Sequence, residues 1–257
     1  MPGTSAYVIC TAPRSGSTLL CMLLAATGVA GDPKSYFHVA SVDRWAESLG
    51  IEPDPSLSER ARLAKVFAAA RVAGRVAGRS GTAVFGLRLQ AHSLTFFRDQ
   101  LALLYPDAPD DRARLRSAFG PTRFLSLHRT NKIDQAVSHL MAKQTGVWHV
   151  AADGREIERL APLTEPVYDA AAIRRCIAQL EAWDSLWESW FAREGITPLR
   201  IDYDALADDP RKTVQGVLED LGRDPSTASG LAVPTLKLAD ATNREWARRF
   251  RSESGEA

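Results

Sequence analysis

A loop from Thr11 to Thr18 lies between two segments with different apolar patterns. The run before it, Tyr7 to Cys10, is short and apolar, which predicts a buried strand. After the loop, leucines recur at helical spacing, at Leu19, Leu20, Leu23 and Leu24. The loop therefore joins the carboxyl end of a strand to the N-terminus of a helix. This geometry aims backbone N–H groups and the positive end of the helix dipole at an anion.

The side chains of this loop favour a phosphate or sulfate ester as the anion. Arg14 adds a full positive charge, and a guanidinium can grip two oxygens at once, whereas a lysine is a point charge. We expect Ser15, Gly16, Ser17 and Thr18 to complete the contacts. No lysine precedes Ser17 or Thr18, so the loop departs from the nucleoside triphosphatase pattern and a small-molecule kinase is the weaker interpretation. The loop alone also fits an ordinary turn with a surface arginine.

Composition limits the class of protein. A chain of 257 residues can bury a large core as one domain. Its 32 basic and 31 acidic residues give a net charge of +1, so no bulk attraction to nucleic acid or membrane is expected. Cys10, Cys21 and Cys176 lack metal-ligand spacing, and no metal site is predicted. Without a leader or a bilayer-length apolar run, the sequence predicts a cytoplasmic protein with no membrane span.

Strand-like and helix-like segments alternate along the rest of the chain. Further strands are predicted over 82–89, 123–127 and 199–201. Helices are predicted over 41–49, 56–72, 91–104, 110–119, 131–144 and 168–191. This alternation predicts an α/β fold with a P-loop-like central parallel sheet flanked by helices on both faces. In such folds, ligands gather beyond the carboxyl ends of the strands.

Three arginines, Arg71, Arg75 and Arg79, follow one another at four-residue intervals. They would share one face if the helix continued through them, but the glycines between them disfavour this. One interpretation is that these arginines form a solvent-exposed face. The alternative is that they contact an anionic acceptor or partner.

A second anion-binding element follows the strand predicted over 123–127. That strand ends in His128 and Arg129, and the next helix carries Ser138. A guanidinium at a strand end and a hydroxyl about two turns into the following helix could hold a second phosphate group. The residues alone leave open that Arg129 pairs with Asp134 and that Ser138 bonds a backbone carbonyl.

In combination, these segments resemble the sulfotransferases that use 3′-phosphoadenosine 5′-phosphosulfate. Pro13 to Thr18 matches their 5′-phosphosulfate loop, Arg129 and Ser138 match their 3′-phosphate pair, and Tyr203 matches a tyrosine that approaches the nucleotide. More narrowly, the chain resembles the bacterial trehalose 2-sulfotransferase family over nearly its full length, through 26–31, 135–138, 144–145, 147–148 and 245–246.

The resemblance implies an enzyme that moves a sulfuryl group from this donor to a hydroxyl without a metal. It also implies one sulfotransferase domain over residues 1–257. Arg88 occupies the place where the family has a lysine at the end of the second strand. We expect Arg14 and Arg88 to act in catalysis, stabilising the charge that develops on the leaving phosphate in a loose transition state.

The resemblance also implies a general base, but both family positions depart from the pattern. Ser35 stands where the trehalose enzymes have a glutamate, and Gln90 where the other sulfotransferase branch has a histidine. Three nearby groups could substitute: Asp32, His38 and His92. We favour His38 because an imidazole has an unperturbed pKa of about 6.5, whereas Asp32 would need desolvation to become a stronger base.

An aromatic and polar wall is predicted for the acceptor. Ser35, Tyr36, Phe37 and Trp148, with His149, would suit a sugar ring or a lipid headgroup. Without the family glutamate, trehalose itself is a weak expectation, and a carbohydrate, a glycolipid or another small hydroxylated metabolite is predicted. A nucleotide-binding protein that has lost catalysis is the alternative. The sequence leaves homodimer formation open.

Overall fold

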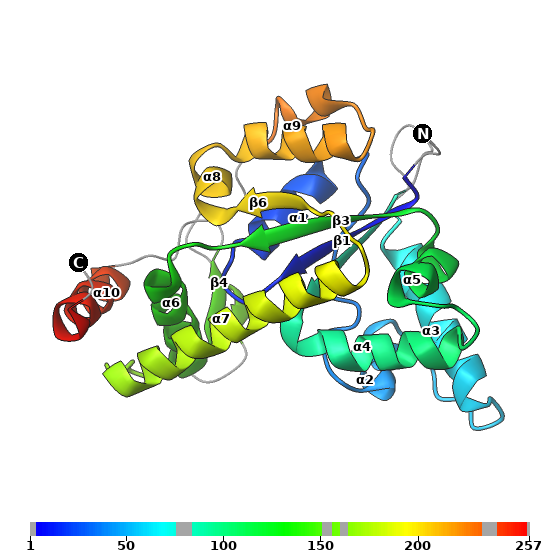
Figure 1. The fold of residues 1–257 in the computed structure, drawn as a ribbon, viewed down its shortest axis with the longest axis horizontal. Helices are drawn as coiled ribbons and strands as arrows, with labels where there is room; N and C mark the ends of the chain where they lie inside the picture. The colour runs from blue at the N-terminus through cyan, green and yellow to red at the C-terminus, as the bar shows by residue number, and fades with distance from the viewer. Residues whose placement is uncertain (1–3, 76–83, 151–155, 160–163, 233–240, 256–257) are drawn as a thin grey trace.

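A parallel sheet of four strands forms the centre of the computed structural model (Figure 1). The structure describes residues 4–75, 84–150, 156–159, 164–232 and 241–255. In spatial order, the strands are β2 (Phe85–Gln90), β1 (Ala6–Thr11), β3 (Thr122–His128) and β6 (Leu199–Asp202). The predicted α/β class with a central parallel sheet is confirmed.

Helices cover both faces of this sheet (Figure 1). One face packs against α1 (Ser17–Ala26) and α9 (Pro210–Asp220). The other packs against α3 (Glu59–Ala73), α4 (Ala91–Leu104), α5 (Asp111–Phe119) and α7 (Ala170–Arg193). Every residue of β1 is buried, as expected of a central strand between two helical layers. Its side chains alternate, so Tyr7 and Ile9 face α1 and α9 whereas Val8 and Cys10 face the opposite layer.

The parallel register aligns the carboxyl ends of the strands. Thr11, the last residue of β1, pairs with Gln90 of β2 and Leu127 of β3. His128 of β3 pairs with Asp202 of β6. The segments that follow these strands therefore begin along one edge of the sheet, where ligands of α/β proteins bind.

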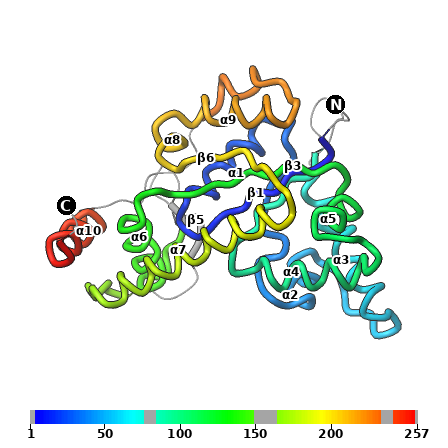
Figure 2. Tube along the Cα trace, in the orientation of Figure 1, coloured from blue at the N-terminus to red at the C-terminus, as the bar shows by residue number. Residues whose placement is uncertain are grey.

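A further group of elements borders this edge. It consists of α6 (Lys132–Thr145), the antiparallel pair β4 (Val147–Val150) and β5 (Glu156–Arg159), α8 (Tyr203–Asp208) and α10 (Ala241–Ser254). Figure 2 shows α10 beside α6, where Trp246 and Phe250 join a core cluster with Val137 and Met141. The remaining elements are α2 (Val42–Ser48) and the short 3-10 helix η1 (Pro225–Ala228). Among the described helices, none is both long and apolar enough to cross a membrane.

The start of α3 was predicted too early from the sequence. The sequence predicted a helix from residue 56, but α3 begins at Glu59 because the Ser58 hydroxyl caps the N–H of Ala61. It ends at Ala73, so Arg71 lies in its last turn and Arg75 lies beyond it, and these two arginines do not share one helical face. Arg79 and residues 82–83 of the predicted second strand lie outside the described residues. The elements β4, β5, α8, α9, η1 and α10 were not predicted.

An aromatic cluster fills the core between α2, α3 and α4. Phe37 is only 1% exposed, and its ring centroid lies 4.7 Å from that of Phe67 and 5.0 Å from those of Trp45 and Phe97. Phe37 therefore belongs to the core, and the prediction that it contacts the acceptor is wrong. Tyr36 beside it is also buried, with its ring against Phe85 and its hydroxyl donating to the carbonyl of Asp32.

The burial of Phe37 predicts a large loss of stability in the Phe37→Ala variant. Removing a buried aromatic ring should lower the free energy of unfolding by about 3–5 kcal/mol. Equilibrium unfolding in urea measures this loss. Val39→Ala is the matched control, because Val39 lies two residues further on and is 51% exposed; its loss should stay within about 0.5 kcal/mol. Equal losses in both variants would contradict the assignment of Phe37 to the core.

Candidate active site

The loop between β1 and α1 has a left-handed backbone at Arg14 and Gly16. Their φ angles are 63° and 82°, and Gly16 is the N-cap residue of α1. Left-handed backbone is uncommon for residues other than glycine, and such turns point successive N–H groups into one concavity that suits an anion. The N-terminus of α1 adds its dipole at the same place. The predicted strand, loop and helix are confirmed.

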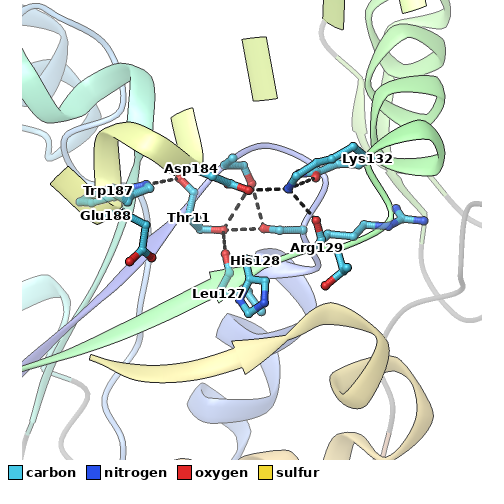
Figure 3. Close-up of polar contacts among 12 residues, drawn as sticks. Thr11, Leu127, His128, Arg129, Lys132, Asp184, Trp187 and Glu188 are labelled. Atoms are coloured by element: carbon cyan, nitrogen blue, oxygen red, sulfur yellow. Dashed lines mark hydrogen bonds and ion pairs between the residues drawn. The ribbon is translucent and has the colours of Figure 1, made fainter. Parts of the chain in front are cut away.

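Buried hydroxyl groups hold this loop on the end of the sheet. Ser15 is 0% exposed; its Oγ donates to the carbonyl of Ala12 at 2.8 Å and shares a hydrogen bond with Thr11. The Thr11 hydroxyl donates to the Leu127 carbonyl of β3 at 3.0 Å, and the indole of Trp187 donates to the Thr11 carbonyl (Figure 3). The Ser15 side chain thus supports the loop. The anion contact predicted for Ser15 is left to its backbone N–H.

Tyr203, the first residue of α8, lies between the loop and Arg129. A Cβ atom added at Gly16 would lie 2.7 Å from Cδ2 of Tyr203, so only glycine allows this approach. The guanidinium carbon of Arg129 lies 4.4 Å from the centroid of the same ring, within the range of a cation–π contact. The tyrosine ring therefore separates the loop from a second cationic group.

Arg129 is a buried cation with an incomplete set of partners. It is 8% exposed, and its Nε has no hydrogen-bond partner among the described residues. Its ion pair with Asp134 spans 3.8 Å, and Asp134 also binds Arg251 of α10 at 2.8 Å. Burying a charge is costly unless it is paired and hydrogen-bonded. The carboxylate of Asp134 is shared between two arginines, so the environment of Arg129 suits an additional anion.

Arg14 and Ser138 are direct partners in this structure. The Nε of Arg14 donates to Oγ of Ser138 at 3.0 Å, and its Nη1 donates to the backbone carbonyl of Trp148. The sequence assigned Arg14 to the 5′ end of a nucleotide and Ser138 to the 3′ end. A phosphate that binds either residue would share or replace this hydrogen bond.

A polar contact between α6 and α7 was missed by the sequence analysis. Lys132 forms an ion pair with Asp184 of α7 at 2.5 Å and donates to the backbone carbonyl of Arg129 at 2.6 Å (Figure 3). Gln135 accepts from Lys132 and donates to the carbonyl of Pro13 at 2.8 Å. These bonds fix the backbone at Arg129 and anchor α6 to the loop. The three-residue spacing of Lys132 and Gln135 was the only sequence signal for them.

Arg88 connects the loop of residues 31–38 with the first turn of α1, beside the loop that joins β1 to α1, which we call the anion loop. Its Nε donates to Oγ of Ser35 at 2.8 Å, and its Nη1 donates to Oγ1 of Thr18 at 2.7 Å. The backbone N–H of Arg88 donates to the carbonyl of Lys34, so residues near Lys34 run alongside the end of β2. Arg88 therefore lies between the two segments expected to hold donor and acceptor.

The candidate bases have different surroundings. Asp32 forms an ion pair with Lys34 at 2.5 Å. The side chain of His38 is exposed, and its backbone carbonyl accepts hydrogen bonds from Ser93 and from the ring of His92. Desolvation lowers the pKa of His92 to about 4, and the nearby His38 lowers it further while the carbonyl bond opposes the shift. The side chain of His149 lies outside the described residues.

The site is a cationic edge of a parallel sheet, and sequence comparison identifies the class of the protein. The family model described as Stf0 sulphotransferase matches residues 6–253. The chain belongs to this family and is a sulfotransferase.

Similar proteins of known name cover nearly the whole chain. It is 32% identical to trehalose 2-sulfotransferase from Mycobacterium tuberculosis, over 96% of this chain and 95% of that one. It is 31% identical to trehalose 2-sulfotransferase from Mycolicibacterium smegmatis, over 97% and 96% of the two chains. A crystal structure of a sulfotransferase from Alicyclobacillus acidocaldarius aligns over 98% of this chain and 93% of its own, with 16% identity and a TM-score of 0.43. That TM-score is too low to support an argument.

The close approach of Gly16 to Tyr203 predicts different effects for two glycine substitutions. Both Gly16 and Gly28 have positive φ, at 82° and 70°, but only Gly16 has a neighbour that an added Cβ would meet. Gly28→Ala should lower the free energy of unfolding by about 1–2 kcal/mol through backbone strain alone. Gly16→Ala should lose at least about 1 kcal/mol more through overlap with the tyrosine ring. Denaturant unfolding measures both, and equal losses would show that the ring does not press on Gly16.

Proposed function

We propose that this sulfotransferase takes the sulfuryl group from 3′-phosphoadenosine 5′-phosphosulfate and transfers it to a hydroxyl of a sugar. The observation that carries the donor assignment is Arg129, a buried cation whose Nε lacks a partner among the described residues, placed one tyrosine ring away from the anion loop. Two anion sites separated by an aromatic ring match a nucleotide with phosphate groups at both ends.

The residues present fit this donor. The backbone N–H groups of Ser15, Gly16, Ser17 and Thr18 would bind the 5′-phosphosulfate at the N-terminus of α1. The Ser138 hydroxyl, with Arg129, would bind the 3′-phosphate. The ring of Tyr203 would lie against the nucleotide between them.

Catalysis in this account rests on positioned cations. Sulfuryl transfer resembles phosphoryl transfer, in which a loose, in-line transition state moves negative charge onto the leaving phosphate. Arg14 and Arg88 would stabilise that charge, and preorganised donors of this kind each contribute about 10²–10³ in rate. Arg88 also holds Ser35 and Thr18, so it would align the acceptor loop with the donor.

A sugar acceptor is supported by the named relatives and by the residues near Arg88. Ser35 and Trp148 would contact the acceptor, and the backbone at Tyr36 would shape the loop around it. The predicted bases His38 and Asp32 stay predictions; the carboxylate of Asp32 is paired with Lys34. No feature of the described residues favours a lipid headgroup over a sugar.

Transfer of a radioactive label tests this function. The protein would be incubated with sulfur-35-labelled donor and, separately, with trehalose, glucose, other disaccharides and a glycolipid. We expect a labelled sugar. Tight binding of the product nucleotide, 3′-phosphoadenosine 5′-phosphate (PAP), with no labelled product from any acceptor would instead support a binding protein without transferase activity.

Donor binding should depend on Arg129, which follows β3, and not on a similar arginine near the other end of that strand. Hydrogen bonds to charged groups contribute about 1.5–3 kcal/mol, so Arg129→Gln should weaken PAP binding by about 10–100-fold. Arg123→Gln is the matched control, because Arg123 lies near the amino end of β3 and pairs with Asp220. Isothermal titration calorimetry measures both dissociation constants. Equal changes in the two variants would contradict the proposed 3′-phosphate site.

A further inference from the structure

A row of aromatic rings lies beside the proposed reaction site. The ring of His92 lies 4.8 Å from that of His38 and 6.0 Å from that of Trp183, measured between centroids. The ring of His139 lies 6.4 Å from Trp183 and 5.6 Å from Trp148. Trp183 thus has two histidine rings as neighbours, one from α4 and one from α6.

The row of aromatic rings lies near the carboxyl ends of the strands. His92 follows Gln90, the last residue of β2, by two positions. Trp183 lies one helical turn before Trp187, whose indole donates to the carbonyl of Thr11 at the end of β1. His139 is adjacent in sequence to Ser138, the partner of Arg14. The three rings of His92, Trp183 and His139 therefore border the edge where the donor is proposed to bind.

His139 is buried, and its ring nitrogens lack hydrogen-bond partners among the described residues. Its exposed fraction is 3%. Burial lowers its pKa to about 4, with further lowering by Lys143, Arg14 and His92, so the ring is neutral at neutral pH. A neutral imidazole has one donor and one acceptor nitrogen, and a hydroxyl group can satisfy either. Hydroxyl-rich ligands suit such a group.

His92 is accessible and has a defined orientation. The residue is partly exposed to solvent and its ring is partly desolvated, and one ring nitrogen donates to the backbone carbonyl of His38. A hydrogen bond of this kind selects the tautomer and leaves the other nitrogen with a lone pair. Its lowered pKa keeps this nitrogen unprotonated at neutral pH. His92 is thus a proton acceptor held in place by its neighbour.

We propose that the acceptor sugar binds against Trp183 between His92 and His139, with His139 binding a hydroxyl of the sugar and His92 accepting the proton of the hydroxyl that is sulfated. This inference rests on the proposed function and assigns the acceptor side of the same site. It moves the role of general base from His38 to His92 and leaves His38 as a positioning residue through its carbonyl.

The chemical step is balanced with the donor named above. The acceptor oxygen forms a bond to sulfur while the bond between sulfur and the bridging oxygen of the 5′-phosphate breaks. The hydroxyl proton passes to the free nitrogen of His92, which becomes an imidazolium. The products are the sugar sulfate ester and PAP, and the imidazolium then releases its proton to water.

The pH dependence follows from the groups around His92. His38 faces it from the loop before α2 and favours its neutral form electrostatically, and His139 lies beyond Trp183. The bound donor is strongly anionic, so it should raise the pKa of His92 above its value of about 4 in the free protein. Because the base must be neutral, kcat should fall as the pH drops through this raised pKa, and nuclear magnetic resonance titration of the His92 ring in the PAP complex should give the same value.

The His92→Gln variant tests the proposal that His92 is the general base. The acceptor is trehalose or, if trehalose is not sulfated, the sugar of the acceptor panel that is labelled fastest. We expect kcat to fall by about 10²–10⁴-fold, the acidic limb of the kcat profile to disappear and the dissociation constant of PAP to stay unchanged. His38→Gln keeps the backbone carbonyl and removes only the ring, so its loss of kcat should be much smaller. A larger loss in His38→Gln than in His92→Gln would overturn the proposal.

The His139→Phe variant tests the sugar contact. Phenylalanine keeps a buried ring between the tryptophans but removes both nitrogens, so the fold should be retained. We expect the KM for the sugar to rise by tenfold or more while PAP binding and kcat change little. A residue with only a structural role would not change the sugar KM alone, and an unchanged KM would contradict the proposal.

Different results would contradict the proposed function and the proposed acceptor site. If the wild-type protein labels no sugar, both the proposed function and this inference are wrong. If it labels a sugar but neither variant shows the expected change, the proposed function stands and only the assignment of the acceptor site to His92, Trp183 and His139 is wrong.

Discussion

The parallel pairing of β1 with β2 on one side and β3 on the other is the constraint on which the site depends. The register places Thr11 opposite both Gln90 and Leu127, so the chain leaves all three strands at one edge. Hydrogen bonds from the Thr11 hydroxyl to Leu127 and from Trp187 to the Thr11 carbonyl hold that edge together (Figure 3). The anion loop and Arg129 lie near each other because of this alignment.

The partners of Arg88 differ from those of a group of arginines elsewhere in the protein. Arg98, Arg114 and Arg193 surround the buried carboxylate of Asp111, which neutralises part of their charge. Arg88, in contrast, is bonded to the hydroxyls of Ser35 and Thr18, which accept hydrogen bonds but carry no charge. A chain with a net charge of only +1 can therefore present a local positive field to an anionic donor.

The sequence predicted the loop, the parallel sheet and the place of Arg129 because these depend on local patterns. It did not predict the pairing of Lys132 with Asp184 or the row from His92 to His139, because both depend on how α6, α7 and the start of α4 pack together. Phe37 was assigned to the acceptor because an aromatic ring in that loop would suit a sugar ring. Its burial is decided instead by Trp45, Phe67 and Phe97 from three other segments.

The central claim is that the loop and Arg129 form a site for a nucleotide with a phosphate at each end. Isothermal titration of the unmodified protein with PAP and with adenosine 5′-phosphate tests it most directly, since the two ligands differ only in the 3′-phosphate. The account predicts that PAP binds at least about tenfold more tightly, as expected for a charge-assisted contact. Equal dissociation constants for the two nucleotides would contradict it.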